Sequence, residues 1–176
     1  MVSNPDIFTE PGQELPFEIQ TLDTPEGELY LRFYLASGLE LALPATGIAE
    51  VTQPSPEQIT PIPNASPILL GTINLRGKII WVADLGQFLG DSGSLNTDRP
   101  TIPIIAIENQ EQIIGLAIER IGEMDWLDVE QTQVTTDLPE RMAPFVQGQW
   151  QLNDSSAQNL NLLDPAKILR SARWAA

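Results

Sequence analysis

The sequence contains no cysteine and no histidine. Without cysteine there is neither a thiolate nucleophile nor a disulfide framework, and without histidine the commonest general base and metal ligand is missing. A zinc site of the usual thiolate or imidazole kind is therefore excluded. The chain also lacks a glycine-rich phosphate loop of the Walker or dinucleotide-binding type. We therefore expect no cofactor, no metal and no enzyme, and only a carboxylate-dependent hydrolase stays open as a catalytic alternative.

Basic residues are scarce, since 9 Lys and Arg stand against 24 Asp and Glu for a net charge of -15. This balance repels phosphate backbones and anionic lipids, so nucleic acid and membrane surfaces are not expected partners. No apolar run approaches the ~20 residues that span a bilayer, and the N-terminus lacks the pattern of a secretion signal. Together with the absence of cysteine, these features predict a cytoplasmic protein without direct membrane insertion.

The first part of the chain differs in composition from the rest. It is rich in proline, glycine and acidic residues, and no lysine or arginine occurs before Arg32. Such a segment cannot bury enough apolar surface to fold alone, so residues 1–27 are expected to form a disordered acidic arm. The apolar residues Phe8, Leu15, Phe17 and Ile19 leave a short docking motif open. Residues 28–176 then form the folded domain, whose hydrophobic content supports a buried core.

The folded part reads mainly as short strands. Leu29 to Leu35 alternate apolar and polar residues with period two, which is typical of a half-buried strand. Further strands are expected over residues 39–43, 47–52, 73–75, 79–82, 101–108, 112–118, 126–134, 145–152 and 159–163. A helical turn is expected at 67–70, a short helix between Asp84 and Gly90, and a C-terminal helix after Asp164-Pro165. Many short strands with glycine and proline turns predict an all-β sandwich or barrel.

The second half of the chain repeats the first at a spacing of 73 residues. Five pairs of similar residues share this spacing: Leu41 and Ile114, Leu43 and Leu116, Ile48 and Ile121, Glu50 and Glu123, Val51 and Met124. Matches at one fixed spacing indicate an internal repeat. The sequence therefore predicts two similar β-modules.

The central stretch of the chain predicts a β-hairpin with Arg76-Gly77 at its turn. Two apolar runs, residues 73–75 and 79–82, flank this dipeptide. Gly77 can take a positive φ without a Cβ clash, as tight hairpin turns require. An arginine at such a tip is expected to hold its guanidinium free for a bidentate contact with a partner carboxylate.

The residues from Gly71 to Gly90 also resemble a known signature. The run Gly71-x-x-Asn74-Leu75-Arg76-Gly77, followed by Asp84-Leu85 and Leu89-Gly90, is similar to that of the CheW-like adaptor family. The strand Ile48-x-Glu50-Val51 and the segments 114–118 and 162–164 fit the same family. The resemblance extends over about residues 29–170, which is nearly everything outside the arm.

The resemblance implies a scaffold rather than an enzyme. Proteins of this family consist of two five-stranded SH3-like β-barrels, with short helices that include a C-terminal one. They couple the cytoplasmic tips of methyl-accepting chemoreceptors to the regulatory domain of a chemotaxis histidine kinase, and an apolar groove between the barrels receives the receptor tip. Carried over to this chain, the partner-binding residues are Ile48, Glu50, Asn74, Arg76, Gly77 and Lys78.

The chain departs from the usual pattern at three positions. Trp81 stands where proline is common, Ala83 replaces an aliphatic residue and Gly86 replaces an arginine. A hairpin followed by Trp-x-x-Asp-Leu resembles the subgroup tied to type IV pilus motility and phototaxis. Trp81 itself is expected to be a core or rim residue of a barrel. An alternative function for the same fold is a spacer or inhibitor that binds only the kinase.

Overall fold

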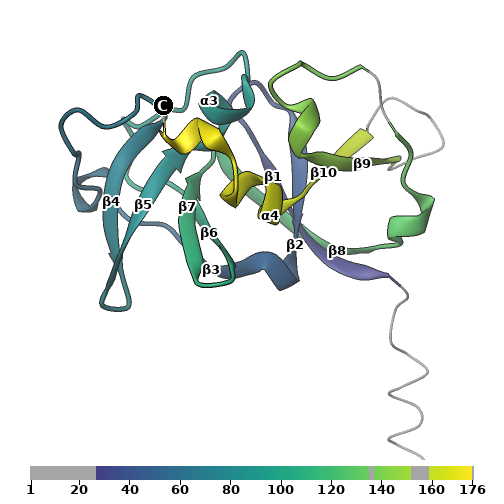
Figure 1. Ribbon diagram of the computed structural model, residues 1–176, viewed down its shortest axis with the longest axis horizontal. Coiled ribbons are helices and arrows are strands. Elements are labelled where there is room, and N and C mark those ends of the chain that lie inside the picture. Colours follow the sequence, from purple (N-terminus) through teal and green to yellow (C-terminus); the bar gives the residue numbers. More distant parts are fainter. Residues whose placement is uncertain (1–26, 135–136, 152–158, 176) are drawn as a thin grey trace, which may run out of the picture.

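The computed structural model describes residues 27–134, 137–151 and 159–175, and within them two five-stranded sheets lie side by side (Figure 1). Barrel A has the strand order β8 (Arg120–Leu127), β1 (Glu28–Tyr34), β2 (Glu40–Pro44), β10 (Asn159–Leu163) and β9 (Val146–Gln151). Barrel B has the order β3 (Ile48–Thr52), β6 (Ile104–Asn109), β7 (Gln112–Ala117), β5 (Lys78–Asp84) and β4 (Leu69–Leu75). The expected all-β architecture of two five-stranded barrels is confirmed.

Short helical segments connect and cover the strands. The α-helices are α3 (Leu85–Leu89) and α4 (Pro165–Leu169), and the 3-10 turns are η2 (Ala45–Gly47), η3 (Pro56–Gln58), η4 (Val129–Gln131), η5 (Ala143–Phe145) and η6 (Ala172–Ala175). No helix in the described residues is long and apolar enough to cross a membrane. The predicted arm lies outside the described residues, apart from Gly27.

Each barrel is closed by the segment that follows its edge strand. Thr60, downstream of β3, pairs with Thr72 on β4, and Gln133, downstream of β8, pairs with Gln149 on β9. Each bridge pairs two backbone N–H groups with two carbonyls, so part of the open edge of each sheet is covered. The same device in both barrels reflects the internal repeat.

The repeat is real, but its two copies exchange strands. In each copy the first strand pairs antiparallel with the second, and the second runs parallel to a fifth strand. That fifth strand comes from the other copy, as do the third and fourth strands of the same sheet. The two predicted β-modules are present, but each is assembled from strands of both halves of the chain. The 73-residue spacing reports equivalent positions, whereas strand pairing depends on where the chain crosses between the barrels after β2 and β7.

The largest apolar cluster lies between the two barrels. It joins one face of β1 and β2, including Phe33 and Leu41, to one face of β6 and β7, including Ile107 and Leu116. The opposite faces of these strands fill the barrel interiors, with Tyr30 and Ala42 in barrel A and Ile104 and Ala106 in barrel B. Alternate residues thus serve two different cores, which follows from the period of two along a strand. The expected shared core is confirmed.

The two α-helices begin in the same way. Asp84 accepts a hydrogen bond from the Gln87 N–H at 3.1 Å, and Asp164 accepts one from the Ala166 N–H at 3.0 Å. Each carboxylate satisfies an N–H group that has no partner within its own helix. Gly90 ends α3 in the left-handed conformation. Both predicted helix starts and the Gly90 stop are confirmed.

Three local predictions were wrong. Residues 126–134 are not one strand, because β8 already ends at Leu127 and the Asp128 carboxylate accepts the Glu130 N–H to start η4. Residues 67–70 are not a helical turn; a hydrogen-bonded turn at 67–68, in which the Leu69 N–H donates to the Ser66 carbonyl at 2.9 Å, leads into β4 at Leu69. The strand expected from 101 begins only at Ile104, directly after Pro103, which has no N–H to donate.

Candidate functional site

The hairpin between β4 and β5 has the predicted two-residue turn. Leu75 pairs with Lys78, and the residues between them, Arg76 and Gly77, have φ values of 53° and 83°. Positive φ at both central positions matches the twist of the flanking strands. The Asn74 side-chain oxygen accepts the Gly77 N–H at 2.8 Å, which fixes the turn. Asn74 and Gly77 therefore shape the tip that presents Arg76.

The sequence predicted a free Arg76 guanidinium, but in the structure Arg76 is paired with Glu50. Its Nε lies 2.8 Å from a carboxylate oxygen of Glu50, while its side chain is 80% exposed and that of Glu50 24% exposed. Glu50 stands on β3, where the register with β6 shifts between Ile48 and Glu50. The ion pair engages the inner edge of the guanidinium, so most of the group still faces solvent. Two residues carried over separately from the resemblance thus form one unit.

The remaining two residues of the predicted set lie beside this unit. Lys78 follows the turn and is exposed. Ile48 is only partly buried and packs against the inter-barrel core, not against the hairpin. The structure therefore brings Glu50, Asn74, Arg76, Gly77 and Lys78 together at one tip and places Ile48 apart, at the junction of the barrels.

Three further apolar side chains are exposed to water, on the two strands that follow the crossovers, β3 and β8. Val51 on β3 is 40% exposed, and Met124 and Trp126 on β8 are 49% and 47% exposed. Val51 and Met124 are equivalent positions of the repeat, so the two crossover strands present similar side chains. We call Ile48, Val51, Met124 and Trp126 the crossover surface. Sequence reasoning paired Val51 with Met124 but did not identify either as surface residues.

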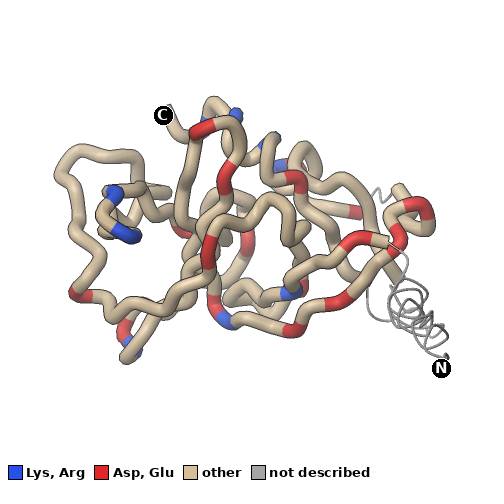
Figure 2. The backbone as a smooth tube through the Cα atoms, turned by 90° about the horizontal axis from the view of Figure 1, so that it is seen from below, with Lys and Arg blue, Asp and Glu red and all other residues tan. Residues whose placement is uncertain are grey.

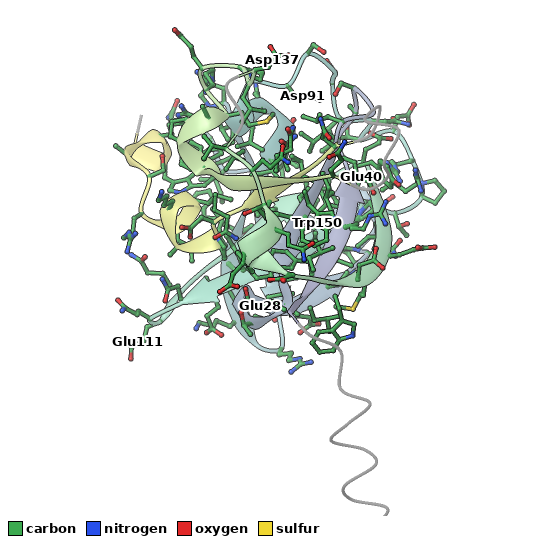
Figure 3. The ribbon with its side chains drawn as sticks, turned by 90° about the vertical axis from the view of Figure 1, so that its right-hand side faces the viewer. Glu28, Glu40, Asp91, Glu111, Asp137 and Trp150 are labelled. Carbon is green, nitrogen blue, oxygen red and sulfur yellow. The ribbon has the colours of Figure 1, made fainter. Side chains whose placement is uncertain are left out.

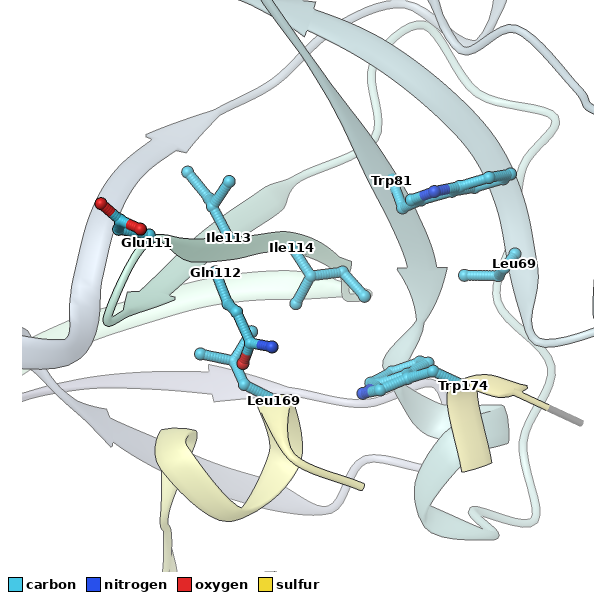
Figure 4. Close-up of a pocket in the computed structure, with 8 residues that line it drawn as sticks. All are labelled: Leu69, Trp81, Glu111, Gln112, Ile113, Ile114, Leu169 and Trp174. Atoms are coloured by element: carbon cyan, nitrogen blue, oxygen red, sulfur yellow. The ribbon is translucent and has the colours of Figure 1, made fainter. Parts of the chain in front are cut away.

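An apolar groove of about 490 Å³ lies between barrel B and the C-terminal segment (Figure 4). Its lining comprises Leu69, Trp81, Glu111, Gln112, Ile113, Ile114, Leu169 and Trp174. Trp81 lines this groove and is 39% exposed, so it is not buried in a barrel core.

Acidic residues are spread over the described molecule instead of converging on one site (Figures 2 and 3). Asp84 and Asp91 line one polar hollow, and burial raises the pKa of Asp84 above its usual value. Both carboxylates are committed to structural hydrogen bonds, since Asp84 caps α3 and Asp91 accepts from the Ser37 N–H and hydroxyl. Within the described ranges no three acidic residues are grouped as metal ligands. This geometry gives a hydrolase no free pair of acids at that hollow.

Comparison with known families now adds to this geometry. A family model described as CheW-like domain matches residues 29–173. The chain belongs to the CheW-like domain family. The match includes both barrels, the hairpin tip and the crossover surface, so the resemblance of the central signature extends to the whole described fold.

Individual relatives of this CheW-like chain are distant. The chemotaxis protein CheW of Rhizobium meliloti (strain 1021) is 28% identical over 79 residues, which is 45% of this chain and 50% of that protein. The chain thus matches about half the length of this curated relative. The crystal structure of the scaffolding protein TtCheW from Thermoanaerobacter tengcongensis superimposes with a TM-score of 0.70 at 24% identity, over 86% of this chain and 93% of that one. At this identity the likeness shows the fold.

Proposed function

We propose that this CheW-like chain is a non-enzymatic adaptor of a chemotaxis-type signalling system in the cytoplasm. In this role it binds the regulatory domain of a histidine kinase and the cytoplasmic tip of a methyl-accepting chemoreceptor at the same time. The observation that carries the proposal is the exposed Arg76 guanidinium, held on a rigid turn by Asn74 and oriented by Glu50. The names of the two relatives, a chemotaxis protein and a scaffolding protein, support the same class.

Two chemically different surfaces suit an adaptor. The hairpin tip is polar and basic, with Arg76 and Lys78, and fits a carboxylate-bearing face of the kinase domain. The crossover surface is apolar and fits the apolar residues of a receptor tip. Because both surfaces lie on barrels that share one core, each partner would be held in a defined orientation to the other.

A binding experiment with separate variants for each surface tests this proposal. The purified kinase regulatory domain and a soluble receptor fragment are titrated separately against the full chain. We expect Arg76→Ala to weaken kinase binding about tenfold, or ~1.4 kcal/mol, with receptor binding unchanged. Met124→Glu should weaken receptor binding and leave kinase binding unchanged, because it places a charge in an apolar contact. Arg120→Ala and Val134→Glu serve as controls, since both side chains are exposed and lie outside these two surfaces.

The results separate the alternatives. Tight kinase binding with no receptor binding by the parent chain would favour the spacer or inhibitor. Equal losses from Arg76→Ala and Arg120→Ala would contradict the assignment of the hairpin tip. That the signalling system controls type IV pilus motility stays a prediction from the sequence.

A further inference from the structure

The apolar groove beside the C-terminal segment is separate from the hairpin tip and the crossover surface. Its floor is the outer face of β5 and β7, with Trp81 and Ile114, and its wall is Leu169 and Trp174 (Figure 4). The apolar face continues past the groove to Ile79, two residues before Trp81 on β5, which is 64% exposed. An exposed apolar strip next to a hollow of this size marks an interaction site.

The wall of the groove is already in place without a ligand. The Trp174 ring stacks on Phe88 with centroids 4.2 Å apart, and its Nε1–H donates to the Ile168 carbonyl at 2.7 Å. Arg173 fixes the same segment by donating to the Phe88 carbonyl at 2.8 Å. Because this wall is already ordered, less conformational entropy is lost when a partner binds.

Two basic side chains lie beside the wall of the groove. Lys167 and Arg170 stand two residues before and one residue after Leu169 of the wall, and both are exposed. Among the described residues, Lys78, Lys167 and Arg170 form no ion pair. Glu111 is the one acid in the lining itself.

The backbone of the floor is not available to a partner. β5 is hydrogen-bonded to β4 on one side and β7 on the other, and β7 is paired with β5 and β6. An added strand therefore has no free edge to join, and recognition must use side chains. A helix can present such a set of side chains to a sheet face, as α4 itself does.

We propose that this groove is a docking site for an amphipathic helix of a partner protein, with apolar residues on one face and acidic residues on its flanks. The apolar face fills the space between Trp81 and Trp174. The acidic flank pairs with Lys167 on α4 and with Arg170 directly after it. This site goes beyond the adaptor surfaces described above and does not depend on which partner occupies them.

Synthetic peptides of about 18 residues, long enough to be helical, test the proposal with the full chain. The first has Leu on one face and Glu on the flanks, the second has Lys in place of Glu, and the third has the Leu/Glu composition scrambled. Binding is followed by fluorescence anisotropy of labelled peptide. We expect saturable binding of the Leu/Glu helix with a Kd on the order of micromolar, and at least tenfold weaker binding of the other two.

Matched variants locate the site. Trp81→Ala, Ile79→Glu and the double variant Lys167→Glu/Arg170→Glu should each weaken the Leu/Glu helix at least about tenfold. Trp126→Ala and Arg120→Glu alter an exposed tryptophan and an exposed arginine of barrel A. These two variants should change the affinity for the Leu/Glu helix less than about twofold. Ile79→Glu guards against misfolding, because its side chain is already 64% exposed.

Four results would overturn the proposal. They are the absence of saturable binding, equal affinity for the Leu/Lys helix, equal losses from Trp126→Ala and Trp81→Ala, and a dimer in light scattering that the peptide dissociates. The last result would assign the groove to a second copy of this chain.

Discussion

Arg76 Nε lies 2.8 Å from a carboxylate oxygen of Glu50, and this ion pair links the β4–β5 hairpin to β3 across barrel B. The two residues are far apart in the sheet order, because β3 and β4 are its opposite edges. Closure of the barrel brings them together. The pair is largely exposed to water on the arginine side, so its role is to orient the guanidinium more than to stabilise the fold.

A double-mutant cycle tests that role. Arg76→Ala and Glu50→Gln are each expected to lower the free energy of unfolding by less than about 1 kcal/mol, because exposed ion pairs contribute little. The coupling energy between them should be similarly small, as measured by urea denaturation. Binding of the kinase domain should fall in both single variants, since Glu50→Gln leaves the guanidinium without its orienting partner. A stability loss above ~2 kcal/mol from Arg76→Ala would show that the pair is structural.

Two glycines of the hairpin should respond differently to alanine. A Cβ on Gly71 would lie 2.2 Å from the Thr60 carbonyl oxygen, whereas a Cβ on Gly77 would meet nothing within 4 Å. Gly77→Ala therefore only forces an alanine into a positive φ, which we expect to lower the free energy of unfolding by about 1 kcal/mol. Gly71→Ala must also break the close approach that closes barrel B, and we expect it to cost about 2–4 kcal/mol. Melting curves of the two variants compare them directly, and equal losses would contradict this account.

The exchanged strands predict that neither half of the chain folds alone. A fragment ending at Gly93 contains β1 and β2 without β8, β9 and β10, the other three strands of their sheet. A fragment starting at Asp98 has β6 and β7 without β3, β4 and β5. Each should lack a cooperative thermal transition, and mixing the two should restore one. A cooperative transition in either isolated fragment would be inconsistent with the observed pairing.

Asp84 makes stability depend on pH in a definite direction. Burial raises its pKa in the folded state above the usual value of 3.8. Between the unfolded and the folded pKa the folded state binds more protons, so the contribution of Asp84 to stability falls as the pH rises through this window. Asp84→Asn keeps an oxygen for the Gln87 N–H but cannot ionise. We expect the parent to lose stability relative to Asp84→Asn as the pH is raised from about 3 to 7, measured by urea denaturation at each pH. A gain over this range would contradict the burial effect.

The sequence determined the local features of this protein. The alternation from Leu29 to Leu35 predicted β1, and Asp84, Gly90 and Asp164 predicted where the helices begin or end, because these signals act within a few residues. Arg76-Gly77 predicted the turn for the same reason. The 73-residue spacing also identified equivalent positions in the two copies of the repeat.

Only the tertiary structure decided how these features combine. The strands of the two copies are similar, so they can pair within a copy or between copies with nearly the same local chemistry. The paths of the chain after β2 and β7 decide that strands are exchanged between the copies. Barrel closure, not any local pattern, brings Glu50 to Arg76. The groove beside Trp81 and Trp174 depends on where the C-terminal segment docks. Contacts between residues distant in the chain are set by packing of the whole core, which no local window of the sequence contains.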